Sequence, residues 1–277
     1  MAENTVKQGG IADRMPGPDP DEQARQSLER IKHKFIIMSG KGGVGKTSVS
    51  VNLALALANK GYQVGLMDVD LHGPDIPHML GLSGMLTADD SKKMVPIPYS
   101  DHLKIISMES LMPNRDEAII WRGPVKHSAI RQFIGDVTWG DLDFLIIDSP
   151  PGTGDEPLTV AQLIPDAKAV IVTTPQEVAL ADIRKSISFC RNVRMAIFGI
   201  IENMSGFTCP HCGKVVDLFG TGGGEKTAHN HGIPFLGKIA FDPEMVQCGD
   251  TGLAFQKKFT QSPITLAFQE IADKMAG

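Results

Sequence analysis

The sequence predicts an α/β fold in which a mostly parallel sheet carries helices on both faces. Short apolar segments recur along the chain, and longer segments with helical periodicity alternate with them. A glycine-rich loop separates the first apolar segment from the first helical one. Strands buried on both faces are typical of parallel sheets, and alternation with helices supplies the crossovers that such sheets need.

The expected elements follow one another in a regular order. The first strand is KFIIMS (34–39), and the first helix runs from Gly45 to Lys60 and stops at Gly61, which is typical of a glycine C-cap. The next strand is QVGLMDVD (63–70). Further strands are expected at 103–108, 142–148, 167–174, 195–203 and 234–241, and helices near 124–135, 155–163, 177–192, 222–231 and 261–275. Because no repeat or internal linker is present, we expect a flexible N-terminal tail over 1–30 and one domain over 31–277.

Composition narrows the class of protein. The chain has 277 residues, of which 42% are hydrophobic and 21% charged, as in soluble globular proteins. Its net charge of −5 disfavours a general binder of nucleic acid or anionic membranes. No apolar run reaches the length of a membrane span, and the N-terminus lacks a signal-peptide pattern, so we expect a cytoplasmic protein.

The loop GKGGVGKT (40–47) matches the pattern G-x-x-x-x-G-K-[ST], and it lies between an expected strand and an expected helix. Glycines allow successive backbone N–H groups to surround phosphate oxygens, and the helix N-terminus adds its positive dipole. Lys46 is expected to reach the β- and γ-phosphates, and the Thr47 hydroxyl to bind Mg²⁺. The expected phosphate-binding residues are Gly42, Gly43, Val44, Gly45, Lys46, Thr47 and Ser48. A glycine-rich turn without a ligand is the alternative, and the matching context disfavours it.

Carboxylates follow two expected strands at the edge where α/β sheets bind ligands. Asp148 ends LDFLIID, and we expect it to hold Mg²⁺. Asp70 is the candidate for orienting the attacking water, and Asp68 for supporting the Mg²⁺ shell. Either Asp68 or Asp70 could instead cap a helix at 74–80, because aspartate is a favoured N-cap residue.

Lys41 is not required by the phosphate-loop pattern. A lysine at the start of the loop points away from its own nucleotide unless the chain bends sharply. It could cross a dimer interface and neutralise charge on a partner's phosphates, as a finger residue does. A solvated surface lysine is the alternative.

Two of the four cysteines, Cys209 and Cys212, form a C-x-x-C turn. A tetrahedral metal site needs four ligands, so this turn supplies only half of one. His229 and His231 could complete a zinc site, although their spacing is tighter than in zinc fingers. A redox pair is disfavoured because the turn follows a strand rather than opening a helix, and a turn without function is the remaining alternative. Cys190 and Cys248 have no partner at ligand spacing.

The lysine-led loop KGGVGKT resembles the deviant Walker A class of P-loop NTPases, which includes the MinD, ParA, nitrogenase-iron-protein and Mrp/ApbC relatives. Several stretches resemble the Mrp/ApbC iron–sulfur cluster carriers: DVDLHGPDIPHMLG (68–81), WRGPVKHSAIRQFIGDVTWGDLDFLIIDSPPGTGDEPLT (121–159), IENMSGFTCPHCG (201–213) and FGTGGGEKTA (219–228). The resemblance covers about residues 32–275.

This resemblance implies roles for individual residues. Lys41 would be the signature lysine that acts across the dimer, and Asp70 and Asp148 would belong to the two nucleotide switches. Asn203 would hydrogen-bond adenine. Cys209 and Cys212 would be cluster ligands.

The function implied is that of a slow ATPase that carries iron–sulfur clusters. Two protomers would share a [4Fe–4S] cluster through their C-x-x-C turns, since a C₂ interface brings the same patch of each chain together. We expect ATP, Mg²⁺ and the cluster as ligands, an assembly scaffold as donor and apo iron–sulfur proteins as recipients, with no nucleic acid and no membrane as partner.

The main alternative is a positioning or partition ATPase with a structural zinc site. Such a protein needs a basic amphipathic helix or a basic surface stripe. The C-terminal stretch 264–277 is net acidic and carries Ile264, Phe268, Ile271 and Met275 at helical spacing. We expect it to be a helix packed on the body.

Overall fold

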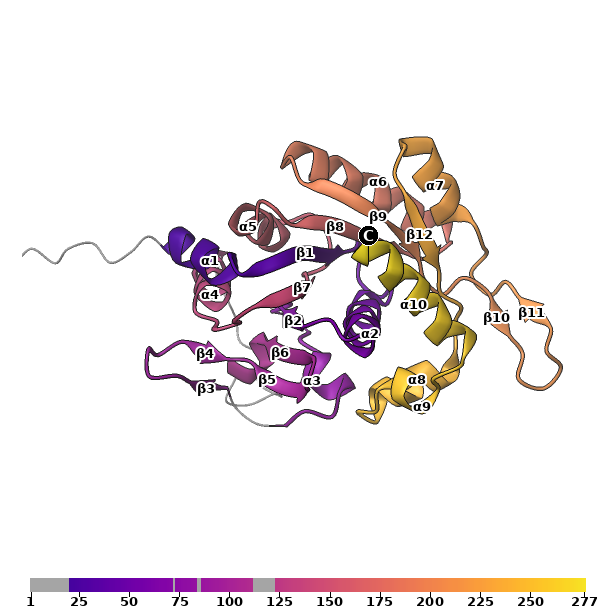
Figure 1. Cartoon of the computed structure of the whole chain (residues 1–277). Coiled ribbons are helices and arrows are strands. Elements are labelled where there is room, and N and C mark those ends of the chain that lie inside the picture. Colours follow the sequence, from indigo (N-terminus) through magenta and orange to yellow (C-terminus); the bar gives the residue numbers. More distant parts are fainter. Residues whose placement is uncertain (1–19, 72, 84–85, 112–122) are drawn as a thin grey trace, which may run out of the picture.

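A computed structural model describes residues 20–71, 73–83, 86–111 and 123–277, and it has an eight-stranded sheet at its centre (Figure 1). The strand order is β12-β9-β8-β1-β7-β2-β6-β5, and every neighbouring pair is parallel except β5 with β6. These strands are β1 (Ile31–Met38), β2 (Val64–Asp68), β5 (Ile97–Ser100), β6 (Leu103–Ser107), β7 (Leu142–Asp148), β8 (Lys168–Thr173), β9 (Ala196–Glu202) and β12 (Phe235–Lys238). The mostly parallel sheet expected from the sequence is confirmed.

Helices cover both faces of this sheet (Figure 1). One face carries α2 (Lys46–Asn59), α8 (Pro243–Asp250), α9 (Phe255–Lys258) and α10 (Pro263–Ala276), with α3 (Ile76–Met79) beside them. The other face carries α1 (Pro20–Leu28), α4 (Gly123–Gly135), α5 (Asp155–Leu163), α6 (Glu177–Asn192) and α7 (Gly223–His231). A short 3₁₀ turn, Met108–Leu111, follows β6.

The central strands are apolar along their length because both of their faces are covered. In β1, Phe35 and Ile37 belong to the hydrophobic cluster on the α2 face, whereas Ile36 and Met38 belong to the cluster on the opposite face. Helix α2 lies between the sheet and α10, which is why every residue from Val49 to Ala58 is buried.

The N-terminal boundary and the smaller strands differ from expectation. Residues 1–19 lie outside the described part, but Pro20–Leu28 is helix α1, which packs against α4 through the buried Leu28. The nine residues of α1, which we assigned to the tail, therefore belong to the folded body. The antiparallel edge strand β5 was not expected, nor were the hairpins β3 (Thr87–Ala88) with β4 (Met94–Val95) and β10 (Phe207–Thr208) with β11 (Val215–Val216).

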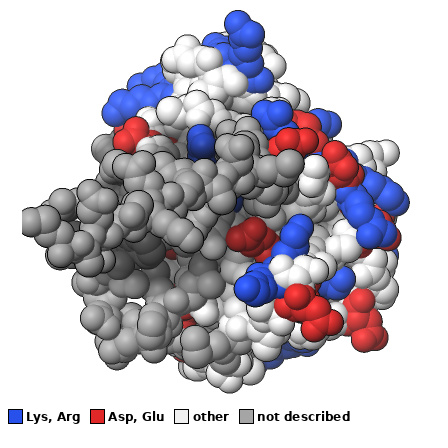
Figure 2. Space-filling model, turned by 90° about the vertical axis from the view of Figure 1, so that its left-hand side faces the viewer, with Lys and Arg blue, Asp and Glu red and all other residues white. Residues whose placement is uncertain are grey.

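Helix α10 is packed on the body as expected. Ile264, Phe268, Ile271 and Met275 are all buried, and α10 packs against α2 and β12. Within the described ranges, no helix is long and apolar enough to cross a membrane. On the face shown in Figure 2, acidic and basic side chains are interspersed outside the grey region.

Candidate functional site

The phosphate loop lies at the carboxyl edge of the sheet, between the end of β1 and the start of α2. Gly43 and Gly45 both have a φ of +80°, and Gly45 is the N-cap of α2. Only glycine adopts this left-handed conformation at little cost. A side chain at Gly40 would meet the backbone of Asp182 at 2.5 Å. The strand–loop–helix context expected from the motif is therefore present.

Asp148 is the centre of a buried network beside this loop. Thr47 Oγ1 donates to Asp148 Oδ2 at 2.7 Å, and Ser50 Oγ donates to Asp148 Oδ1 at 2.6 Å. The Lys46 ammonium lies 2.8 Å from Asp148 Oδ2 and 3.9 Å from Asp70 Oδ2. Because Asp148 is fully buried, these partners compensate for the loss of water around its charge.

Asp68 lies directly beside Asp148, because the two residues are paired in the parallel ladder of β2 and β7. Burial, and next the negative charge of Asp148, raise the pKa of the Asp68 carboxyl well above its ordinary value of 3.8. Ser107 Oγ donates to Asp68 Oδ2 at 3.0 Å. Asp68 therefore lies inside the body of the protein, next to Asp148 and Asp70 rather than on the loop itself.

Asp70 lies beyond the end of β2 and retains 7% exposure. Its backbone N–H donates to Asp68 Oδ1 at 3.1 Å. Helix α3 begins only at Ile76, with Asp75 as its N-cap, so neither Asp68 nor Asp70 is a cap for that helix. Asp70 instead lies near the Lys46 ammonium.

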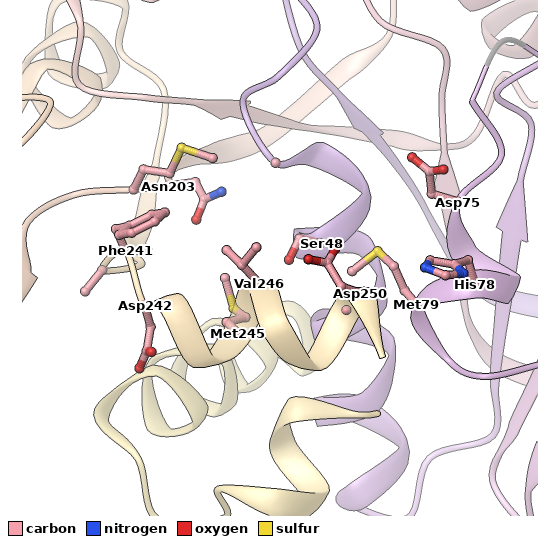
Figure 3. Close-up of a pocket in the computed structure, with 14 residues that line it drawn as sticks. Ser48, Asp75, His78, Met79, Asn203, Phe241, Asp242, Met245, Val246 and Asp250 are labelled. Atoms are coloured by element: carbon pink, nitrogen blue, oxygen red, sulfur yellow. The ribbon is translucent and has the colours of Figure 1, made fainter. Parts of the chain in front are cut away.

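A cavity of about 320 Å³ adjoins the loop on the α8 side. Its lining includes Gly45, Ser48, Asn203, Phe241 and Met245 (Figure 3). Asn203 Nδ2 donates to the carbonyl of Val44 at 2.9 Å, so this amide holds the phosphate loop as well as bordering the cavity.

Asn203 also presents an acceptor. Its Oδ1 is buried and receives no hydrogen bond from the described residues. A buried acceptor without a donor is unfavourable, and an exocyclic amine of a base can supply that donor. The cavity and this oxygen therefore fit the base of a nucleotide whose phosphates lie on the loop.

Lys41 is half-buried at the start of the loop, and its carbonyl accepts from Ser39 Oγ at 2.9 Å. No carboxylate of the described residues forms an ion pair with its ammonium. The Lys41 side chain therefore takes no part in the ion pair between Lys46 and Asp148.

The C-x-x-C turn is the tip of the hairpin β10–β11, which projects from the body (Figure 1). Cys209 N donates to the carbonyl of Lys214, and Gly213 N donates to the carbonyl of Cys209, both at 2.9 Å. Gly213 closes this turn with a φ of +69°. Cys209 is half-buried, Cys212 is exposed, and both are free thiols.

The turn also changes the acidity of one thiol. Backbone N–H groups of Cys212 and His211, followed by the Cys212 side chain, lower the pKa of Cys209 from its ordinary value of 9.0. Thiolates rather than thiols bind metal, so this arrangement prepares Cys209 as a ligand. By contrast, burial raises the pKa of Cys190 to about 11.

The in-chain zinc site is not formed. Among the residues that the structure describes, no group of three or more His, Cys, Asp or Glu is placed to hold a metal ion. His229 and His231 instead lie in the last turn of α7. Within the described residues, the C-x-x-C turn thus brings together two thiols and no further metal ligand.

Two buried polar residues near the candidate site were missed from the sequence. Ser50 lies one helical turn after Lys46, and that spacing was a usable signal for a second donor to Asp148. Glu202 is a fully buried carboxylate at the end of the apolar strand β9, where a charge requires partners. It accepts from Ser205 Oγ at 2.5 Å and from the backbone of Gly222 at 2.8 Å and Gly224 at 2.5 Å.

Comparison with known proteins gives consistent similarities. The chain is 49% identical over 257 residues to an iron–sulfur cluster carrier protein of Saccharolobus solfataricus, covering 92% of this chain and 86% of the relative. It is 45% identical over 262 residues to a cytosolic Fe–S cluster assembly factor of Kluyveromyces lactis, covering 90% and 92%. The nucleotide-binding protein of Archaeoglobus fulgidus, solved in complex with ADP, is 37% identical with a TM-score of 0.75, covering 89% of this chain and 95% of that one.

A family model described as ParA, the NUBPL iron-transfer P-loop NTPases, matches residues 30–276, which is nearly the whole chain. The strand–loop–helix of the phosphate site and the projecting C-x-x-C hairpin both lie within the matched range. The chain therefore belongs to the ParA-type family of NUBPL iron-transfer P-loop NTPases.

Proposed function

We propose that this protein is an ATP-dependent iron–sulfur cluster carrier in which two copies hold one cluster between their C-x-x-C turns. The observation that carries the proposal is the projecting hairpin, which presents Cys209 and Cys212 without further metal ligands from the described chain. The names of the relatives from Saccharolobus solfataricus and Kluyveromyces lactis support the same function.

The number of thiolate ligands supports a cluster shared by two copies. A [4Fe–4S] cluster takes four thiolates, and one chain offers two in the turn. Two-fold symmetry would supply the other two from the same turn of a second copy. Val215, Val216 and Leu218 leave apolar surface exposed beside the turn, which supports contact of this hairpin with another protein surface.

ATP would bind with its phosphates on the loop and its base in the cavity beside Asn203. Lys46 would exchange its ion pair with Asp148 for the β- and γ-phosphates. The hydroxyl of Thr47 and the carboxylate of Asp148 lie 2.7 Å apart and form the oxygen donor set that Mg²⁺ prefers. These two residues would hold the ion, which neutralises phosphate charge when bound.

Hydrolysis would depend on a second copy. Asp70 would orient the attacking water, since it lies at the edge of the Lys46 network. Lys41 would reach the phosphates of the partner protomer, because it forms no ion pair with the described residues of its own chain. A site that is complete only in the dimer hydrolyses ATP slowly until the dimer forms.

The remaining parts of the proposal concern location and partners. The carrier would act in the cytoplasm, receive its cluster from an assembly scaffold and deliver it to apo iron–sulfur proteins. It would do so without nucleic acid or a membrane as partner. Nucleotide binding or hydrolysis would alter the geometry of the two hairpins and so the hold on the cluster.

The test is anaerobic reconstitution of the protein with iron and sulfide. We expect brown protein with one [4Fe–4S] cluster for each dimer, measured by iron and sulfide content, visible absorption and sedimentation. Cys209→Ala and Cys212→Ala should each abolish cluster uptake and leave ADP binding unchanged.

Cys248→Ala is the matched control, because Cys248 is a buried cysteine outside the turn and should keep the cluster. Protein that retains zinc through purification and takes up no iron would exclude the carrier function while leaving the NTPase family unaffected. A cluster bound by a monomer would exclude the shared site.

A further inference from the structure

The cavity beside Asn203, called the nucleotide cavity below, shares lining residues with a second cavity next to the C-x-x-C hairpin. This second cavity, of about 410 Å³, is lined by Phe207, Thr208 and Pro210 among others. Ala240, Phe241 and Asp242 line this cavity and also the nucleotide cavity. Figure 3 shows Phe241 and Asn203 near each other among the residues that line the cavity on the α8 side.

Phe241 also contacts both arms of the hairpin segment. Its ring centroid lies 6.2 Å from that of Phe207, which belongs to β10, and 6.2 Å from that of Phe219, which follows β11. The Phe219 contact has an interplanar angle of 76°, the edge-to-face arrangement that aromatic pairs favour. The backbone N–H of Phe241 also donates to the carbonyl of Gly206 at 2.8 Å.

The root of the hairpin is fixed separately. The Glu202 carboxylate binds Ser205 at one end of the segment and Gly222 and Gly224 at the other. Hydrogen bonds to a charged acceptor are among the stronger ones in proteins. The hairpin therefore has a fixed root at Glu202, and its body rests on the ring of Phe241.

We propose that Phe241 is a positioning residue that couples occupancy of the nucleotide cavity to the placement of Cys209 and Cys212. A base that enters the cavity beside Asn203 packs against Phe241, and that ring cannot shift without moving Phe207 and Phe219. Packed aromatic contacts move between discrete arrangements rather than deforming continuously. The hairpin would then turn about its Glu202 root and reorient the thiols.

The biological meaning of this coupling rests on the proposed function, but the coupling itself can be measured in protein without a cluster. Linkage makes the coupling reciprocal. If a nucleotide changes the affinity of the cysteines for a ligand by a given factor, that ligand changes the affinity for the nucleotide by the same factor. The coupling operates within one chain and therefore acts in addition to any rearrangement of two protomers.

The test measures the rate at which N-ethylmaleimide alkylates Cys209 in reduced, cluster-free protein, by mass spectrometry of the peptide, with and without saturating Mg·ADP. We expect ADP to change this rate about fivefold or more, the lower end of usual coupling strengths. Phe219→Ala should bring the ratio to near one. Its affinity for ADP should stay close to that of the wild type, because Phe219 does not line the nucleotide cavity.

Phe198→Ala is the matched control. Phe198 is also half-buried, and its ring forms an edge-to-face pair with Phe35 elsewhere in the protein. This variant should keep the wild-type ratio, and Phe219→Tyr should restore it because the ring is retained. Phe207→Ala provides an independent break of the same contact should Phe219→Ala fail to fold.

Two results would overturn the proposal: a wild-type alkylation rate that ADP does not change, or an unchanged ADP effect in both Phe219→Ala and Phe207→Ala. Failure of the carrier function has a different signature. It would appear as wild-type protein that takes up no cluster during reconstitution, whatever the alkylation rates are.

Discussion

Gly45→Ala tests how the phosphate loop and the nucleotide cavity are held together. Gly45 has a φ of +80°, where an alanine costs about 1–2 kcal/mol. Its new methyl group would also overlap Asn203 Nδ2. Displacing that amide would break its 2.9 Å hydrogen bond to Val44, worth about 1 kcal/mol, and forced overlap costs about 1–3 kcal/mol more. We expect the free energy of unfolding to fall by about 3–6 kcal/mol from these contributions.

Gly43→Ala is the matched control for this substitution. Gly43 has the same φ of +80°, but a methyl group added there would meet no atom within 4 Å. Only the backbone cost of about 1–2 kcal/mol is therefore expected, measured by urea denaturation of the nucleotide-free protein.

A double-mutant cycle isolates the overlap. Asn203→Ala removes the group that the new methyl of Gly45→Ala overlaps, so the double variant should lose about 2–4 kcal/mol less stability than the sum of the two single losses. Equal losses for Gly43→Ala and Gly45→Ala, together with additive behaviour in the cycle, would refute the reasoning.

Three further predictions concern charged residues. Because the pKa of Asp68 is raised, its contribution to stability is greatest below 3.8 and declines as pH rises toward its folded pKa. Asp68→Asn should therefore gain stability relative to wild type with increasing pH, by up to about 1.4 kcal/mol per pH unit, and parallel urea midpoints across pH 4–8 would contradict this. Lys41→Ala should bind ATP normally but lose hydrolysis in a phosphate-release assay; unchanged turnover would exclude a role across the dimer. Glu202→Ala leaves the half-buried N–H of Gly222 and the buried N–H of Gly224 without their acceptor and should cost about 2–4 kcal/mol in urea denaturation, whereas a loss under 1 kcal/mol would show that water replaces the carboxylate.

Apolar runs were a reliable guide to the sheet because strands covered on both faces leave a continuous signal. The run LDFLIID ends at Asp148, and the strand ends at the same residue. The hairpin around Cys209 left no such signal. Its strands have two residues each, and Val215 and Val216 are exposed, so neither alternation nor burial marks them.

In the candidate site, too, some features could be predicted from the sequence and others could not. The phosphate loop and the C-x-x-C turn are local patterns, and each was visible in consecutive residues. Contacts across the chain were not visible: Asn203 and Val44 are 159 positions apart, and Glu202 meets Gly224 from 22 positions away. No local propensity encodes such pairings, because they form only when separate strands end at the same edge of the sheet.

The sequence by itself determined the main parallel strands and the longer helices between them, the phosphate loop and the pair of thiols, because each depends on periodicity or spacing over fewer than about twenty residues. Only the tertiary structure decided that Asp148 pairs with Lys46, that Asn203 joins the loop to the cavity on the α8 side, and that Phe241 lines both this cavity and the one beside the thiol hairpin. These relations depend on packing between distant segments, and packing is a property of the folded chain rather than of any stretch of it.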